Sequence, residues 1–169
     1  LDTSPERIVW AHGASDVILR TAMAATKKRC AGLPKALVQG PSWHNASYLL
    51  RAGGMKNIEK VPYPDPWSDA SPEQFWEALR QRIASDPPSL IYLVHPHFPT
   101  GVKEANFGDK LRELLTGISG DTLVAVDQTY LGFTEKSEDD DILETLAQFN
   151  DSLVLIRSLS KVEGLAGLR

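Results

Sequence analysis

The stretch SLIYLV, residues 89–94, is a short and nearly continuous apolar run, and TLVAV (122–126) and SLVLI (152–156) repeat its character. A strand has this composition when helices cover both faces of its sheet. Longer amphipathic stretches separate the runs, which is typical of alternating strands and helices. The sequence therefore predicts an α/β fold, a mostly parallel sheet between two layers of helices.

The same patterns predict the remaining elements. We expect further strands at RIVWA (7–11), KALVQ (35–39) and NIEKV (57–61). Helices are expected near 15–30, 44–53, 72–84, 106–117 and 140–148. Two loops are rich in turn-forming or acidic residues, PYPDPWSDASP (62–72) and EKSEDDD (135–141).

Composition limits the class of protein. The chain has 169 residues, 42% of them hydrophobic and 24% charged, which fits one folded domain. A net charge of −4 with interspersed signs gives no reason to expect nucleic acid or an anionic membrane as partner. The single Cys30 can form no internal disulfide, and no apolar run approaches the roughly 18 residues of a membrane helix. We see no signal peptide and expect a cytoplasmic protein.

Polar and turn-forming residues follow the predicted strands at the point where each strand ends. Ligands of doubly wound sheets gather at the carboxyl ends of the strands. The segments that fall there are HGASD (12–16), GPSWHN (40–45), HPHFPTG (95–101), DQTY (127–130) and RSLSK (157–161). We therefore expect a composite binding site built from these loops.

The side chains in these loops suggest the chemistry of a ligand. Asp127 can hold a positive charge in a semi-buried cleft, and Lys161 can act as a nucleophilic amine. Trp43 offers a flat face to a planar ring. Simpler interpretations stay open: Asp127 as a turn cap, Lys161 as a solvated side chain and Trp43 as ordinary core.

A second group of residues suits a phosphate. Ala14 and Ser15 open a predicted helix, where free backbone amides and the helix dipole favour an anion. Ser15 as a simple helix cap is the alternative. Ser158 and Ser160 add hydroxyl donors and Arg169 adds a two-pronged cation. A planar, phosphorylated aldehyde with a basic ring nitrogen would satisfy all of these groups.

These segments resemble one known family. The stretches HGASDVI, PSWHN, HPHFPTG, VAVDQTYLGF and SLSKVEGLAGLR are similar, in this order, to the large domain of fold-type I pyridoxal-phosphate enzymes. The last stretch, Ser158 to Arg169, matches the pattern S-x-S-K-x-x-x-x-x-G-x-R. The resemblance is to class I/II aminotransferases of the histidinol-phosphate aminotransferase-like branch.

The resemblance implies a role for each site residue, with pyridoxal 5′-phosphate as cofactor. Lys161 would form the Schiff base and shuttle the proton at the substrate's α-carbon. Asp127 would pair with the protonated pyridine nitrogen. Tyr130 would donate to the phenolic oxygen of the ring, and Trp43 would stack on it. The phosphate would be held by Ala14, Ser15, Ser158, Ser160 and Arg169.

The chain departs from the family pattern at the loop after residue 94. Relatives usually have N-P-N-N-P-T-G where this chain has HPHFPTG, so Phe98 replaces an asparagine that donates to the phenolic oxygen. Either Tyr130 carries that role alone, or His95 or His97 substitutes. Alternation along an extended chain would send the two histidines to opposite faces, which argues against a metal site, and we expect no bound metal. Gln128 and Thr129 replace the glutamate and alanine of the usual D-E-A-Y.

The resemblance implies a pyridoxal-phosphate-dependent aminotransferase acting on an amino acid and a 2-oxo acid, and a homodimer in the full-length protein. Two alternatives stay open: a decarboxylase or oxidase of amino acids on the same fold, and a non-catalytic domain. Family members are usually more than twice as long. We therefore expect residues 1–169 to be a large domain that lacks an N-terminal segment and a C-terminal small domain.

Overall fold

A computed structural model describes residues 5–28, 32–133, 140–149 and 151–167. Its centre is a sheet of five parallel strands in the order β2-β1-β3-β4-β5. The strands are β1 (Lys35–Gly40), β2 (Asn57–Pro62), β3 (Leu90–Val94), β4 (Leu123–Asp127) and β5 (Leu153–Ile156). The helices are α1 (Ala14–Lys28), α2 (His44–Ala52), α3 (Pro72–Ser85), α4 (Phe107–Gly117) and α5 (Asp140–Gln148). Two short 3-10 helices are η1 (Pro5–Arg7) and η2 (Leu131–Phe133).

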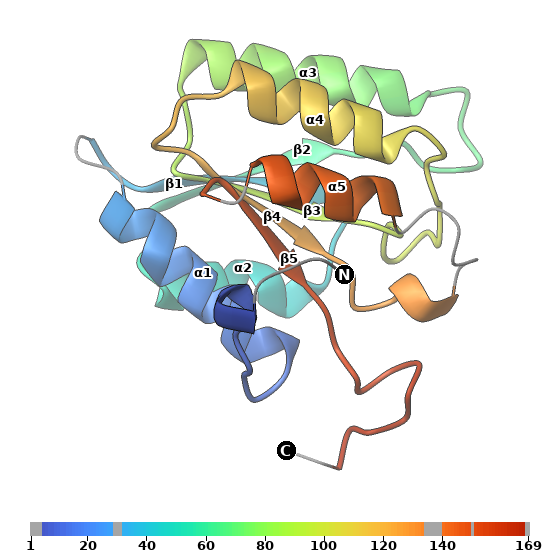
Figure 1. Cartoon of the computed structure of the whole chain (residues 1–169). Helices are drawn as coiled ribbons and strands as arrows, with labels where there is room; N and C mark the ends of the chain where they lie inside the picture. Colours follow the sequence, from blue (N-terminus) through green and yellow to red (C-terminus); the bar gives the residue numbers. More distant parts are fainter. Residues whose placement is uncertain (1–4, 29–31, 134–139, 150, 168–169) are drawn as a thin grey trace.

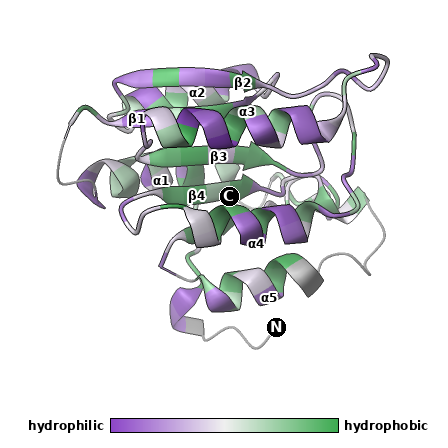
Figure 2. Cartoon of the chain, turned by 90° about the horizontal axis from the view of Figure 1, so that it is seen from above, coloured by the Kyte–Doolittle hydropathy of each residue, from purple (hydrophilic) through white to green (hydrophobic). Residues whose placement is uncertain are grey.

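The helices form two layers, α1 and α2 on one face of the sheet and α3, α4 and α5 on the other (Figure 1). Side chains alternate between these layers along each strand. In β3, Leu90 and Tyr92 belong to the core under α1 and α2, whereas Ile91 and Leu93 belong to the core under the other layer. In the hydropathy view, β3 and β4 are apolar and the helices above them turn polar faces outward (Figure 2). The predicted α/β/α architecture is confirmed.

Most predicted elements are confirmed, and one strand is wrong. The stretch 8–11 forms no regular element, and Val9 and Trp10 are 73% and 83% exposed. An apolar run becomes a strand only where a neighbouring strand accepts its hydrogen bonds. The five paired strands all lie further along the chain, so the apolar residues of 7–11 do not belong to the core of this sheet. Of the predicted acidic loop 135–141, residues 135–139 lie outside the described residues, and α5 begins at Asp140.

The order in which the chain adds strands to the sheet reverses between β1 and β3. From β1 the chain passes through α2 to β2 at one edge of the sheet. It then returns through α3 to β3, on the other side of β1, and continues to β4 and β5. A crevice at the carboxyl ends of the two strands is the usual ligand site of such sheets. Pairing of β1 with β3 ends at Val38 and Tyr92. Beyond that point the Gln39 side-chain oxygen accepts the hydrogen bond of the Val94 N–H, at 2.7 Å, so a side chain replaces the backbone ladder where the strands diverge.

Candidate active site

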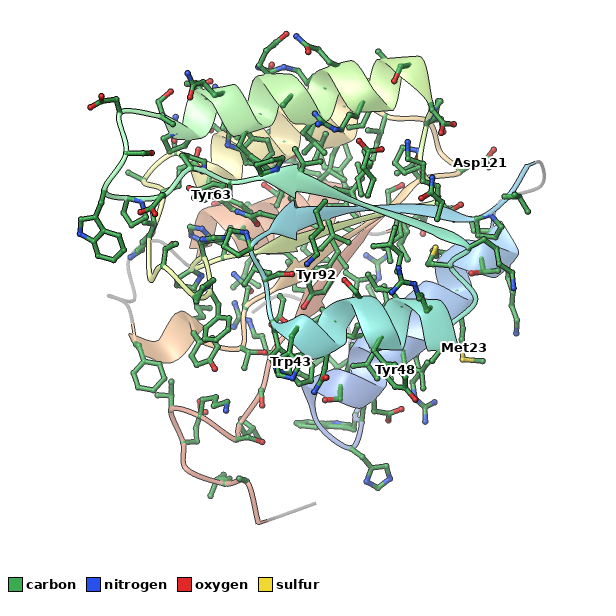
Figure 3. All side chains as sticks on the ribbon, turned by 180° about the vertical axis from the view of Figure 1, so that it is seen from behind. Met23, Trp43, Tyr48, Tyr63, Tyr92 and Asp121 are labelled. Atoms are coloured by element: carbon green, nitrogen blue, oxygen red, sulfur yellow. The ribbon has the colours of Figure 1, made fainter. Side chains whose placement is uncertain are left out.

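The candidate site lies at the carboxyl edge of the sheet, on the face covered by α1 and α2. Tyr92 belongs to the core under these helices, and Asp127 reaches its hydroxyl from the neighbouring strand. Ala14, Trp43 and Phe98 are partly buried and pack against the same core. Figure 3 shows Tyr92 between the sheet and α2, and Trp43 where α2 begins. Three of the predicted loops therefore meet one hydrophobic core.

Asp127 ends β4 and is 8% exposed. Its Oδ2 accepts a hydrogen bond from the Tyr92 hydroxyl at 2.5 Å. Its Oδ1 accepts one from the Thr129 N–H at 2.9 Å and one from the Thr129 hydroxyl at 2.5 Å. Burial, and next the neighbouring carboxylate, raise the pKa of Tyr92 well above its usual value. Tyr92 therefore stays protonated and acts as a permanent donor to Asp127.

Tyr130 joins two segments that are distant in the sequence. Its ring stacks on Phe98, with centroids 5.3 Å apart and planes at 6°. The Lys161 ammonium lies over the same ring, 5.7 Å from its centroid, a distance at which a cation is attracted to an aromatic face. Phe98 follows β3, Tyr130 follows β4 and Lys161 follows β5. The predicted convergence of strand-end loops is thus present for these three residues.

The segment that carries Lys161 runs beyond β5 and packs on η2. A side-chain carbon placed on Gly132 would lie 2.7 Å from the Val162 side chain, so this side chain can pack against the backbone of η2 because residue 132 is glycine. Within the segment, the Ser160 N–H donates to the Ser158 hydroxyl oxygen at 3.2 Å. Ser158 and Ser160 thus lie beside each other on one turn. Arg169 lies outside the described residues.

Helix α1 begins at Ala14, directly after Gly13, whose φ of 89° is readily adopted by glycine. The Gly13 carbonyl accepts from Asp16 N–H, and the Asp16 carboxylate accepts from His12 N–H at 3.2 Å. Ser15 is therefore within the first turn, and the helix start is ordered by Gly13 and Asp16. The capping interpretation of Ser15 is wrong, because the capping position is occupied by Gly13.

The two histidines of the HPHFPTG loop do not take the place of the missing asparagine. His95 stacks on Phe107, with ring centroids 4.0 Å apart, and is buried on the α4 side of the sheet. His97 Nε2 lies 2.9 Å from the Pro41 carbonyl oxygen and Nδ1 lies 2.7 Å from the Thr100 hydroxyl. Both ring nitrogens of His97 are thus engaged, and the imidazole ties the loop after β3 to the loop after β1. Burial lowers the pKa of His97.

A buried polar cluster supports these loops from the α3 side, where Figure 3 shows Tyr63. Glu104 accepts hydrogen bonds from the Trp76 indole at 2.8 Å and the Tyr63 hydroxyl at 3.2 Å. Burial raises the pKa of Glu104, and these two hydrogen bonds partly offset the effect. The Tyr63 ring packs on His97, with centroids 4.3 Å apart. The cluster therefore fixes the back of the His97 loop, away from Asp127.

A shallow hollow of about 240 Å³ opens beside Tyr130, lined by Phe98, Phe133 and the turn at 96–101. Gln128 directly follows β4: its Oε1 accepts from Arg157 Nε at 3.2 Å, and its buried side-chain nitrogen has no hydrogen-bond partner among the described residues. Within the same residues, no cluster of three or more histidine, cysteine or acidic side chains could hold a metal ion.

The structure brings some predicted residues into contact and leaves others apart. Contacts join Phe98, Tyr130 and Lys161, and Ala14 and Trp43 share a core with Phe98. Ser158 and Ser160 contact each other after β5, whereas Ser15 lies in the first turn of α1. Cys30 lies outside those residues. The sequence interpretation missed Tyr92 and Gln39, because a polar atom within a buried strand signals its partner only once the register is known.

Comparison with known proteins agrees with this architecture. The family model "Aminotransferase class I and II" matches residues 1–169, so the chain belongs to that family. The chain is 28% identical over its whole length to histidinol-phosphate aminotransferase of Staphylococcus epidermidis and covers 44% of that protein. It is thus similar to a protein of which it spans less than half.

Two solved structures share the fold. The structure of histidinol-phosphate aminotransferase from Sinorhizobium meliloti, in complex with pyridoxal-5′-phosphate, superposes with a TM-score of 0.76 at 21% identity. That comparison covers 100% of this chain and 42% of the other. The C-S lyase of Staphylococcus hominis superposes with a TM-score of 0.79 at 16% identity, covering 99% of this chain and 41% of that one. These likenesses concern the fold.

Proposed function

We propose that this chain forms the cofactor-binding part of a pyridoxal-phosphate-dependent aminotransferase, which moves an amino group between an amino acid and a 2-oxo acid. One observation carries the proposal: the Lys161 ammonium lies 5.7 Å from the centroid of Tyr130, three residues after the buried Asp127. A reactive amine, a phenol and a buried carboxylate are the groups that this cofactor requires around its ring. Family membership supports the same conclusion.

The residues present fit the cofactor. A carboxylate has about four acceptor positions, and Asp127 uses three of them for Tyr92 and Thr129. One acceptor position therefore remains for a ring N–H at the carboxyl end of β4. Trp43 and Phe98 pack against one core and present aromatic surface at the same edge. The groups for the phosphate are Ala14 and Ser15 at the start of α1, with Ser158, Ser160 and Arg169.

When bound, pyridoxal 5′-phosphate supplies an aldehyde that takes up an amino group and a ring that accepts electrons from the α-carbon. Lys161 would bind the aldehyde carbon and would move the proton at the α-carbon of the substrate. Asp127 would hold the ring nitrogen in its protonated form, and the Tyr130 hydroxyl would donate a hydrogen bond to the ring oxygen. Phe98 excludes water from one side of Tyr130, because its ring covers that face.

Binding and turnover of the full chain test the proposal. Wild type and Asp127→Ala are titrated with pyridoxal 5′-phosphate, and 2-oxo acid formation is measured with a panel of amino acids. We expect Asp127→Ala to weaken binding and to lower turnover at least a hundredfold, since the carboxylate stabilises positive charge in a partly buried site. Equal binding and turnover of the two proteins would refute the role of Asp127.

A second candidate is a decarboxylase or oxidase of amino acids on the same site. It is favoured by Phe98, which replaces a donor with an apolar ring stacked on Tyr130 and thereby changes the electronics of the cofactor. Analysis of products separates these activities. A transferred amino group identifies the aminotransferase, release of carbon dioxide identifies a decarboxylase, and consumption of oxygen identifies an oxidase. A chain without any product would favour the non-catalytic domain.

We also propose a cytoplasmic homodimer. The exposed apolar residues Ile8, Val9 and Trp10 support a covering partner at this part of the chain. Among the described residues, no helix has both the length and the apolar character needed to cross a membrane. Light scattering on the full chain measures the oligomeric state, and a monomer at all concentrations would contradict the dimer.

A further inference from the structure

The carboxylate of Asp127 receives hydrogen bonds from two side-chain hydroxyls. Tyr92 reaches it from β3 and Thr129 from the turn after β4, each with a donor to acceptor distance of 2.5 Å. The Thr129 N–H adds a third hydrogen bond at 2.9 Å. Such short contacts are typical of hydroxyl donors to an ionised carboxylate.

The Tyr92 hydroxyl serves this contact rather than the packing of the core. The side chain is 1% exposed, and the register pairs Tyr92 with Ala125 in β4, two residues before Asp127 on the same face. A phenylalanine would fill the same core without a polar atom to satisfy. Because burying a hydroxyl without a partner is unfavourable, the contact with Asp127 explains why the polar residue is tolerated here.

Thr129 supplies the second hydroxyl from a position that the family pattern fills with alanine. An alanine could donate only its backbone N–H to Asp127. This chain therefore carries one donor more than the D-E-A-Y pattern provides, on the carboxylate oxygen that Tyr92 does not use.

Hydrogen bonds to the ionised form of a carboxyl group favour that form. An ionised carboxylate opposite a pyridine nitrogen in turn favours the protonated ring. We propose that Tyr92 and Thr129 are positioning residues that hold the Asp127 carboxylate toward the ring nitrogen of the bound cofactor and thereby keep that nitrogen protonated. This inference rests on the proposed function.

The test measures the proton on the ring nitrogen directly. The full chain is loaded with pyridoxal 5′-phosphate carrying ¹⁵N in the ring, and the ¹⁵N chemical shift reports the fraction of protonated nitrogen. We expect Tyr92→Phe to change the equilibrium between protonated and unprotonated nitrogen about tenfold toward the unprotonated form, the equivalent of about one pKa unit. Thr129→Val should shift it in the same direction, and Thr129→Ser, which keeps the hydroxyl, should restore the wild-type signal.

Tyr63→Phe is the matched control, because it removes a buried hydroxyl from another carboxylate, Glu104, in the other core layer. It should leave the ¹⁵N shift unchanged. If Tyr92→Phe does not fold, Thr129→Val and Thr129→Ser decide, since Thr129 is only partly buried. Unchanged shifts in loaded Tyr92→Phe and Thr129→Val overturn the inference while the cofactor site stands. A wild type that binds no cofactor overturns the proposed function and this inference together.

Discussion

The rings of Phe98 and Tyr130 lie parallel, at 6° to each other with centroids 5.3 Å apart. Tyr130 also lies beneath the Lys161 ammonium. An apolar ring therefore stands beside the phenol where the family pattern has an amide. Since both histidines of the loop are engaged elsewhere, Tyr130 is left as the donor to the phenolic oxygen in our account.

Phe98→Asn tests this arrangement by restoring the amide donor. A second hydrogen bond to the phenolic oxygen should stabilise its negative charge and weaken its hold on the proton of the neighbouring nitrogen, which joins Lys161 to the cofactor. We expect the pKa of that nitrogen to fall by about one unit, the size of one hydrogen bond to a charged group. The pH dependence of the cofactor's absorbance measures it. Phe98→Leu, which adds no donor, should not produce the decrease, and equal pKa values in all three proteins would contradict the account.

Gly132→Ala tests whether the Lys161 segment must lie against η2. The added carbon would meet Val162 at 2.7 Å and displace the segment next to the lysine. We expect weaker cofactor binding, by about tenfold, with a folded core. Gly120→Ala is the control, because a carbon placed there has no neighbour within 4 Å among the described residues. Equal affinities in the two variants would show that the contact does not position Lys161.

His97 should make the stability of the protein depend on pH. Its pKa is lowered by burial from 6.5, so the unfolded chain binds more protons between the folded pKa and 6.5. The free energy of unfolding should therefore fall as the pH decreases through this window, by at most about 1.4 kcal/mol per pH unit. His97→Gln should flatten this part of the curve in urea titrations, and the exposed His12→Gln should not. If the free energy of unfolding of His97→Gln depends on pH as strongly as that of the wild type, a group other than His97 causes the dependence.

Gln39 should stabilise the point where β1 and β3 diverge. Gln39→Leu leaves the buried Val94 N–H without its acceptor, which should reduce the free energy of unfolding by about 1–3 kcal/mol. Hydrogen exchange of the Val94 amide should accelerate more than that of amides in β4. The exposed Gln74→Leu is the control for the change of side chain. If stability and hydrogen exchange are both unchanged, the Gln39 side chain does not stabilise the point where β1 and β3 diverge.

Much of the fold could be predicted from the sequence, because buried parallel strands carry a strong signal. SLIYLV, TLVAV and SLVLI each became a strand of the sheet, and the helices between them lie where the amphipathic pattern predicts. The prediction for RIVWA failed because its residues are apolar, as in a strand, although they pair with none of the five strands of the sheet. Hydropathy cannot distinguish apolar residues that form a core from those that another surface covers.

The site was only partly predictable for a related reason. Asp127, Tyr130 and Lys161 follow strands directly, so the topology alone brings them to one edge. Tyr92 and Gln39 lie inside strands, where their polar atoms find partners on neighbouring strands only after the register is set. The engagement of His97 with Pro41 depends likewise on the approach of two loops that local patterns do not encode.

The attachment of pyridoxal 5′-phosphate to Lys161 is the central claim. The most direct measurement reduces the loaded full chain with borohydride, digests it and locates the cofactor by peptide mass. We predict the added mass on the peptide that contains Lys161, its loss in Lys161→Ala, and its retention when the exposed Lys56 is replaced by alanine. Cofactor mass on other lysines, or an equal yield from Lys161→Ala, would contradict the account.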